Sequence, residues 1–368
     1  MSKRNNGGPP FKADHVGSLL RPERLLNARR EMKAGNLDGA ALKEIEDQCI
    51  LEVIALQEDV GLQSITDGEF RRDIWHYDFL SGLMGIELVD AIQGPAFSGG
   101  QMVQSLAVTG KIENPNGVLI DHFKFLESNT TKTAKFCIPS PSIAYYRGGR
   151  ALIDEGVYPD LESFWSDLCA AYADEIELLA AAGCTYLQLD DTTFAMFGDP
   201  KMRKMVEDRG DDADDLIKTF ANSINRSIAA RPADFAITVH MCRGNFRSQW
   251  LAEGGYEPVA ERMFGGLEVD GFFMEWDSER AGGFEPLRFA PKDACIVLGL
   301  VTSKFPELES KDYLKRRIDE ASKFVSLDQL CLSPQCGFAS THEGNKLSED
   351  EERRKLELVV ETAAEVWG

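Results

Sequence analysis

The chain has 368 residues, of which 43% are hydrophobic and 9% aromatic, so it is long enough for one large domain with a substantial core. It carries 61 acidic against 40 basic residues, a formal charge of −21, which argues against non-specific binding to nucleic acid or to an anionic membrane. No apolar run approaches the roughly 20 residues of a membrane span, and no secretory signal is visible. The eight cysteines are irregularly spaced, so we expect a reduced, cytoplasmic protein and not a disulfide scaffold.

In chain order, short apolar runs alternate with amphipathic stretches. The predicted strands cover 13–18, 64–69, 134–141, 185–191, 235–242, 271–277, 294–303 and 330–337. Helical patterns cover 38–60, 160–182, 201–230, 254–265, 306–325 and 347–366. Eight strands alternating with helices predict a single (β/α)8 TIM barrel over residues 1–368, with 1–11 as a flexible N-terminus. The alternative is a doubly wound open sheet, which would need a Gly-rich dinucleotide or phosphate loop that the chain lacks.

One segment interrupts this alternation. Residues 87–118 are rich in glycine and β-branched residues, which predicts a β-hairpin inserted between barrel strands two and three. We expect this hairpin to lie over the barrel mouth or at a subunit contact, so a homo-oligomer is a candidate assembly.

Polar and titratable residues follow the apolar runs at the strand ends, where a barrel of this class has its active site. His240 and Cys242 point to the same face of the fifth predicted strand because they are two residues apart. Taken alone, this pair is also compatible with ordinary core packing. A cysteine in a turn beside Pro and Gly, "SPQCGF", is poorly explained by packing. Zinc is bound by thiolate, imidazole and carboxylate, so the strand ends predict a catalytic zinc site with these ligands: His240, Cys242, Glu275 and Cys336.

Several motifs in the same order resemble the catalytic barrel of cobalamin-independent methionine synthase, from about residue 12 to the end of the chain. "DHVGSLLRP" resembles the first-strand segment of that family, "TDGEFRRDIW" its "HGE" motif, and "LQLDD" its "QIDEP" motif. "HMC", the sixth-strand glutamate and "PQCG" match its zinc ligands. The resemblance implies substrate-binding roles for Val16, Gly17, Ser18, Glu69 and Asp190.

The resemblance also implies a mechanism. A free thiol has a pKa of roughly 8.5, and coordination to Zn²⁺ deprotonates it while leaving it nucleophilic. The implied substrates are a small thiol, homocysteine or a coenzyme M-like molecule, and an alkyl donor such as methyl-folate. The leaving group needs a proton, and we name these candidate catalytic groups: Lys304, Asp190 and His15.

The chain also departs from this family. It has one such barrel, whereas the full methionine synthase has a second, N-terminal barrel. Lys304 stands where the family has a proton-transferring histidine, and Arg243 follows the zinc motif, where it is a candidate for binding the anionic group of a substrate. Glu275 lies 33 residues after Cys242, longer than the family spacing suggests, so Asp277 and Glu279 remain alternatives. Two further functions stay open: ring opening of an epoxide by coenzyme M, and a non-catalytic barrel that binds metal or an amino acid.

Overall fold

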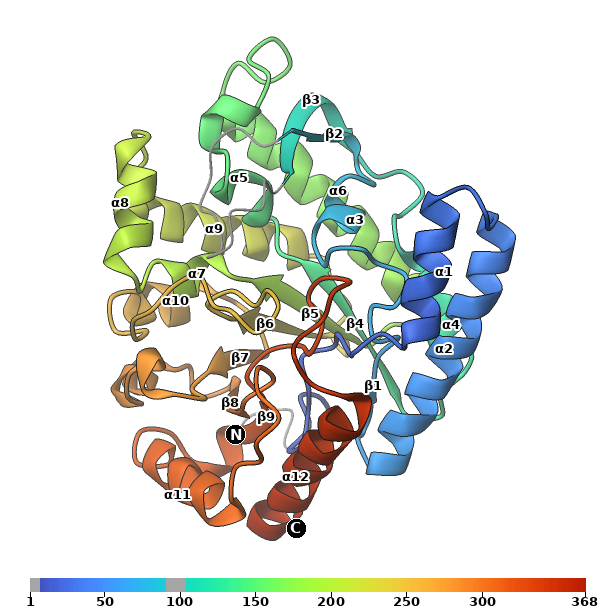
Figure 1. Cartoon of the computed structure of the whole chain (residues 1–368). Helices are drawn as coiled ribbons and strands as arrows, with labels where there is room; N and C mark the ends of the chain where they lie inside the picture. Colours follow the sequence, from blue (N-terminus) through green and yellow to red (C-terminus); the bar gives the residue numbers. More distant parts are fainter. Residues whose placement is uncertain (1–6, 91–103) are drawn as a thin grey trace.

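The computed structural model describes residues 7–90 and 104–368 (Figure 1). Seven parallel strands form one curled sheet in the order β1-β4-β5-β6-β7-β8-β9. Their bounds are β1 Ser64–Ile65, β4 Thr133–Pro139, β5 Tyr186–Asp191, β6 Ala236–Met241, β7 Gly271–Glu275, β8 Cys295–Val301 and β9 Leu330–Pro334. These strands coincide with seven of the eight predicted runs.

The first predicted strand, 13–18, is an extended segment that lies between β9 and β1. Ala13 forms a parallel bridge to Leu332 of β9. On the other side, Thr66 donates a hydrogen bond to the carbonyl of Gly17 at 2.7 Å. The segment leaves regular geometry at Gly17, whose φ is +131°, so only a single bridge forms. It nevertheless occupies the place of the eighth strand, and the predicted (β/α)8 barrel is confirmed.

Helices surround the sheet in Figure 1. The long ones, of eight residues or more, are α1 Glu23–Lys33, α2 Gly39–Val60, α4 Ile120–Glu127, α6 Leu161–Ala181, α8 Pro200–Asp208, α9 Ala213–Ile228, α11 Lys311–Ala321 and α12 Glu349–Trp367. The short ones are α3 Tyr77–Leu80, α5 Ile143–Tyr146, α7 Thr193–Met196 and α10 Ala260–Gly266. Four 3₁₀ turns cover Gly149–Leu152, Glu279–Ala281, Glu285–Phe289 and Leu327–Gln329. None of the helices in the described ranges is both long and apolar enough to cross a bilayer.

One predicted helix needed correction, and two of the long helices, α1 and α4, were not predicted. The pattern over 201–230 is two helices, α8 and α9, because Gly210 adopts a φ of 97° and the Asp212 side chain caps the second helix at the backbone N–H of Asp214 and Asp215. Helix α1 was not predicted, although Pro22 directly precedes its first turn. The side chains of Asp38 and Asp160 cap α2 and α6.

The inserted hairpin lies between β1 and β4, as predicted. Its strands, β2 Met84–Val89 and β3 Ser105–Glu113, pair antiparallel and lie at the top of the view in Figure 1. Glu175 of α6 holds the chain that follows β3, accepting hydrogen bonds from the Asn114 side chain at 2.8 Å and the Val118 backbone at 2.7 Å. Residues 91–103 of the predicted insertion and 1–6 of the predicted flexible N-terminus lie outside the described residues.

Candidate metal centre and active-site cavity

Three predicted metal ligands meet at the carboxyl end of the sheet. His240 lies near the end of β6, Cys242 follows that strand, and Cys336 follows β9. Their ligand atoms, one imidazole nitrogen and two sulfurs, all lie within 4.8 Å of one another, and all three residues are buried. One imidazole and two thiolates are a donor set that suits zinc with a further position open to a substrate.

Asp190 orients the imidazole of His240. The two residues are partners in the parallel register of β5 and β6, and Asp190 Oδ1 lies 3.0 Å from His240 Nδ1. The other ring nitrogen, Nε2, is buried and has no hydrogen-bond partner in the described part of the chain. A carboxylate on one imidazole nitrogen that leaves the other free is the arrangement expected of a metal-binding histidine.

Electrostatics within the cluster favour a thiolate. The hydrogen bond from the Cys242 thiol holds the pKa of Cys336 well below its ordinary value of 9.0, against the opposing effect of burial. Burial lowers the pKa of His240, but the hydrogen bond to Asp190 and the nearby Cys336 sulfur outweigh it and raise that pKa to about 9. The side chains of the cluster therefore stabilise negative charge on the Cys336 sulfur, and the thiolate is the form that binds metal.

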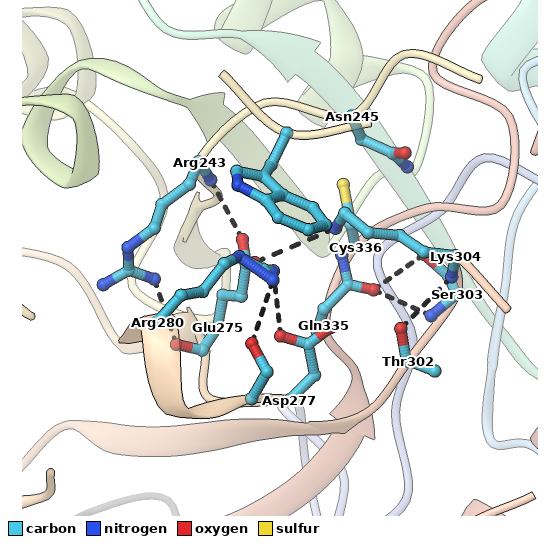
Figure 2. Close-up of polar contacts among 12 residues, drawn as sticks. Arg243, Asn245, Glu275, Asp277, Arg280, Thr302, Ser303, Lys304, Gln335 and Cys336 are labelled. Carbon is cyan, nitrogen blue, oxygen red and sulfur yellow. Dashed lines mark hydrogen bonds and ion pairs between the residues drawn. The ribbon is translucent and has the colours of Figure 1, made fainter. Parts of the chain in front are cut away.

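The fourth predicted ligand, Glu275 at the end of β7, is fully buried but stands apart from this three-residue cluster. Its Oε2 accepts a hydrogen bond from the Arg243 backbone at 2.9 Å, and its Oε1 forms an ion pair with Arg280 (Figure 2). Lys304 Nζ lies 3.8 Å from the same oxygen. Of the two alternatives, Asp277 also pairs with Arg280, at 2.9 Å, and Glu279 is exposed.

Two of the predicted catalytic groups lie behind the cavity wall. Lys304 is buried next to Glu275, its Nζ has no hydrogen-bond partner in the described residues, and burial lowers its pKa. His15 is buried between strands, with Nε2 3.2 Å from the Ser64 carbonyl, and burial lowers its pKa to about 4. The third group, Asp190, lines the cavity.

A second cluster joins two predicted substrate-binding residues to Cys137, which is not among the predicted site residues. Glu69, Cys137 and Asp190 offer ligand atoms that all lie within 4.8 Å of one another. Burial raises the pKa of Glu69 to about 8, and the residue adopts a positive φ of 60°. A Cβ at Gly17 would lie only 2.6 Å from Cys137 Sγ, so the glycine lets the chain pass over this cluster. The sequence feature that could have identified Cys137 is its position two residues before the end of β4.

One cavity of about 330 Å³ connects both clusters. Val16 and Ser18 line it together with the residues of the metal cluster and with Glu69 and Asp190.

Arg243, predicted to bind substrate, does not line the cavity. Its guanidinium donates to the carbonyls of Gly254 at 2.8 Å and Glu275 at 3.2 Å, and stacks over Tyr256. It therefore holds the loop after β6 and the end of β7 in place.

Comparisons with known proteins agree with this geometry. The family profile "Cobalamin-independent synthase, Catalytic domain" matches residues 11–365. The uncharacterized protein YxjH of Bacillus subtilis is 48% identical over 97% of this chain and 95% of its own length. A solved chain from Listeria monocytogenes, described as a candidate vitamin-B12 independent methionine synthase, has a TM-score of 0.78 at 40% identity, covering 98% of both chains. A 5-methyltetrahydropteroyltriglutamate–homocysteine methyltransferase of Klebsiella pneumoniae is 22% identical over 90% of this chain, but only 40% of its own length is covered.

The fold defines a barrel whose carboxyl rim carries a buried, thiol-rich cluster that could hold a metal ion. More particularly, the chain belongs to the family of cobalamin-independent methionine synthase catalytic domains, a family of methyltransferases, as the motifs predicted.

Proposed function

We propose that this protein transfers a methyl group from a small donor to the sulfur of homocysteine, using a zinc ion held by His240, Cys242 and Cys336. The observation that carries the proposal is the convergence of one imidazole and two thiols within 4.8 Å at a cavity wall. When bound, zinc keeps a coordinated thiol deprotonated and nucleophilic at neutral pH. The thiolate sulfur attacks the methyl carbon, and the donor heteroatom leaves with the bonding electron pair and takes up a proton.

The second cluster supports an amino-acid thiol as the acceptor. Glu69 and Asp190 present two carboxyl groups to the cavity, which suit the ammonium group of homocysteine. Occupation by a cation would also lower the pKa of Glu69, which burial now raises to about 8. Val16 and Ser18 line the same cavity, and we propose that their backbone N–H groups bind the amino-acid carboxylate.

Three protein ligands leave one position on zinc for the substrate sulfur. Glu275 stays our candidate fourth ligand, and it would have to leave its ion pair with Arg280 to reach the metal cluster. For the leaving-group proton we propose Asp190 at the cavity, and Lys304 behind it, as the groups to test. Homocysteine is favoured over coenzyme M because its ammonium group can pair with the carboxyl groups of Glu69 and Asp190, whereas coenzyme M carries no cationic group.

Metal analysis and turnover test this function. We expect about one equivalent of zinc in the purified protein and less than half in Cys336→Ser. Cys169→Ser is the matched control, because Cys169 lies on α6, where its thiol donates to the Ser223 carbonyl at 3.4 Å and a hydroxyl can do the same. Zinc content that Cys336→Ser leaves unchanged would refute the metal site. Zinc-edge absorption should gain a sulfur ligand with homocysteine and not with coenzyme M, and absence of methyl transfer would favour a non-catalytic binding barrel.

A further inference from the structure

A cation without an acidic partner lines the same cavity. Arg147 follows α5, lines the cavity, and has the Tyr77 hydroxyl 3.5 Å from Nη1. No carboxylate lies within ion-pairing distance of its guanidinium in the described residues, and every Asp and Glu of the chain falls within the described ranges. In a protein with 61 acidic and 40 basic residues, an arginine that faces a cavity without such a partner points to an anionic ligand.

His76 gives independent evidence for a ligand at this wall. It is only 2% exposed and lines the cavity, yet neither ring nitrogen has a hydrogen-bond partner in the part of the chain that the structure describes. Its ring lies between those of Trp75 and Tyr77, with centroids 4.6 and 4.2 Å away. Burial, with a smaller effect of Arg147, lowers its pKa well below 6.5, so it is a neutral imidazole with one N–H to donate. Buried polar groups are almost always satisfied, so this N–H points to a ligand acceptor.

We infer that Arg147 and His76 bind a carboxylate of the methyl donor at the outer wall of the cavity, which is formed by Trp75, His76, Tyr77 and Arg147. The inference rests on the proposed function. The acceptor thiol is held elsewhere, by the metal cluster and by the carboxyl groups of Glu69 and Asp190, which suit a cation and not an anion. The outer wall is therefore left for the second substrate, and a cavity of about 330 Å³ has room for a ligand larger than homocysteine. The aromatic rings of Trp75 and Tyr77 suit a flat, apolar portion of that donor.

Binding of 5-methyltetrahydrofolate, a donor probe with two carboxylates, to the zinc-loaded protein tests this subsite without turnover. Quenching of tryptophan fluorescence reports the dissociation constant, since Trp75 lines the cavity. Arg147→Gln should raise that constant roughly ten- to hundred-fold, the usual effect of losing a charge-assisted hydrogen bond. Arg147→Lys should recover part of the loss, and His76→Phe, which keeps the ring packing and removes both nitrogens, should weaken binding several-fold. Arg150→Gln is the matched control, because Arg150 pairs with Glu155 and does not line the cavity.

Two further measurements separate the substrates. In Arg147→Gln the KM for homocysteine should stay within about twofold, and so should the rate with methyl iodide, a donor without charge. The inference is overturned if wild-type protein does not bind the folate, if Arg147→Gln leaves its affinity unchanged, or if the KM for homocysteine rises by the same factor. Folate binding that depends on Arg147 in a protein without methyl transfer would support the subsite and refute the proposed function.

Discussion

Glu352 on α12 is a buried carboxyl group that should make the stability of this protein fall as pH rises. The residue is 2% exposed, and its Oε2 accepts a hydrogen bond from the Leu20 backbone at 2.8 Å. Burial raises its pKa from 4.5 to about 8, because the charged form loses its hydration. This contact fixes the chain directly after the cavity-lining segment Val16–Ser18, so the barrel mouth depends on it.

The sign follows from proton linkage. Between pH 4.5 and 8 the folded protein keeps a proton on Glu352 that the unfolded chain has lost, so the free energy of unfolding falls across that window. One pKa unit corresponds to about 1.4 kcal/mol, which makes the loss about 3 kcal/mol at pH 7 and about 5 kcal/mol above pH 8. Glu352→Gln keeps the shape of the side chain without the charge. It should therefore be more stable than wild type by about 3 kcal/mol at pH 7 and equal to it below pH 4.5.

Urea unfolding followed by circular dichroism, at intervals from pH 4 to 8.5, measures this difference. Asp350→Asn, at an exposed acidic residue in the first turn of the same helix, is the control and should run nearly parallel to wild type. Subtraction of the variant curve from the wild-type curve isolates Glu352 from every other titrating group. If Glu352→Gln shows the same dependence on pH as wild type, the carboxyl is not protonated in the folded state and the reasoning fails.

Three further predictions address the site and the barrel. Asp190→Asn should weaken zinc affinity about 10- to 100-fold in a chelator competition, because the carboxylate no longer orients His240; zinc affinity equal to wild type would contradict this. Gly17→Ala should cost about 2–4 kcal/mol in urea unfolding, since its Cβ would lie 2.6 Å from Cys137 Sγ at a φ of +131°. Adding Cys137→Ala should recover part of that loss, and no recovery would show that the contact is not its cause. Leu332→Ala, in the strand that closes the barrel, should cost about 2–5 kcal/mol; a smaller loss would mean that the site collapses around the smaller side chain.

Local patterns predicted most of the fold. Apolar runs ending in polar residues located seven observed strands, and amphipathic patterns located helices such as α2 and α6. The pattern over 201–230 predicted one helix because its apolar spacing continues across Gly210. The chain forms two helices because Gly210 adopts a positive φ, which only the folded chain reveals. Only one bridge forms in the first strand because the chain turns at Gly17 to pass over Cys137, a contact between distant residues.

By itself, the sequence determined which residues stand at the strand ends. Because parallel strands end at one rim, that was sufficient to predict that His240, Cys242 and Cys336 meet. Tertiary structure decided what each side chain contacts across the barrel. The register of β5 and β6 sets Asp190 against His240, and packing turns Arg243 away from the cavity. Such partners come from separate segments of the chain, and no local pattern of residues specifies which of several nearby charges a buried side chain will pair with.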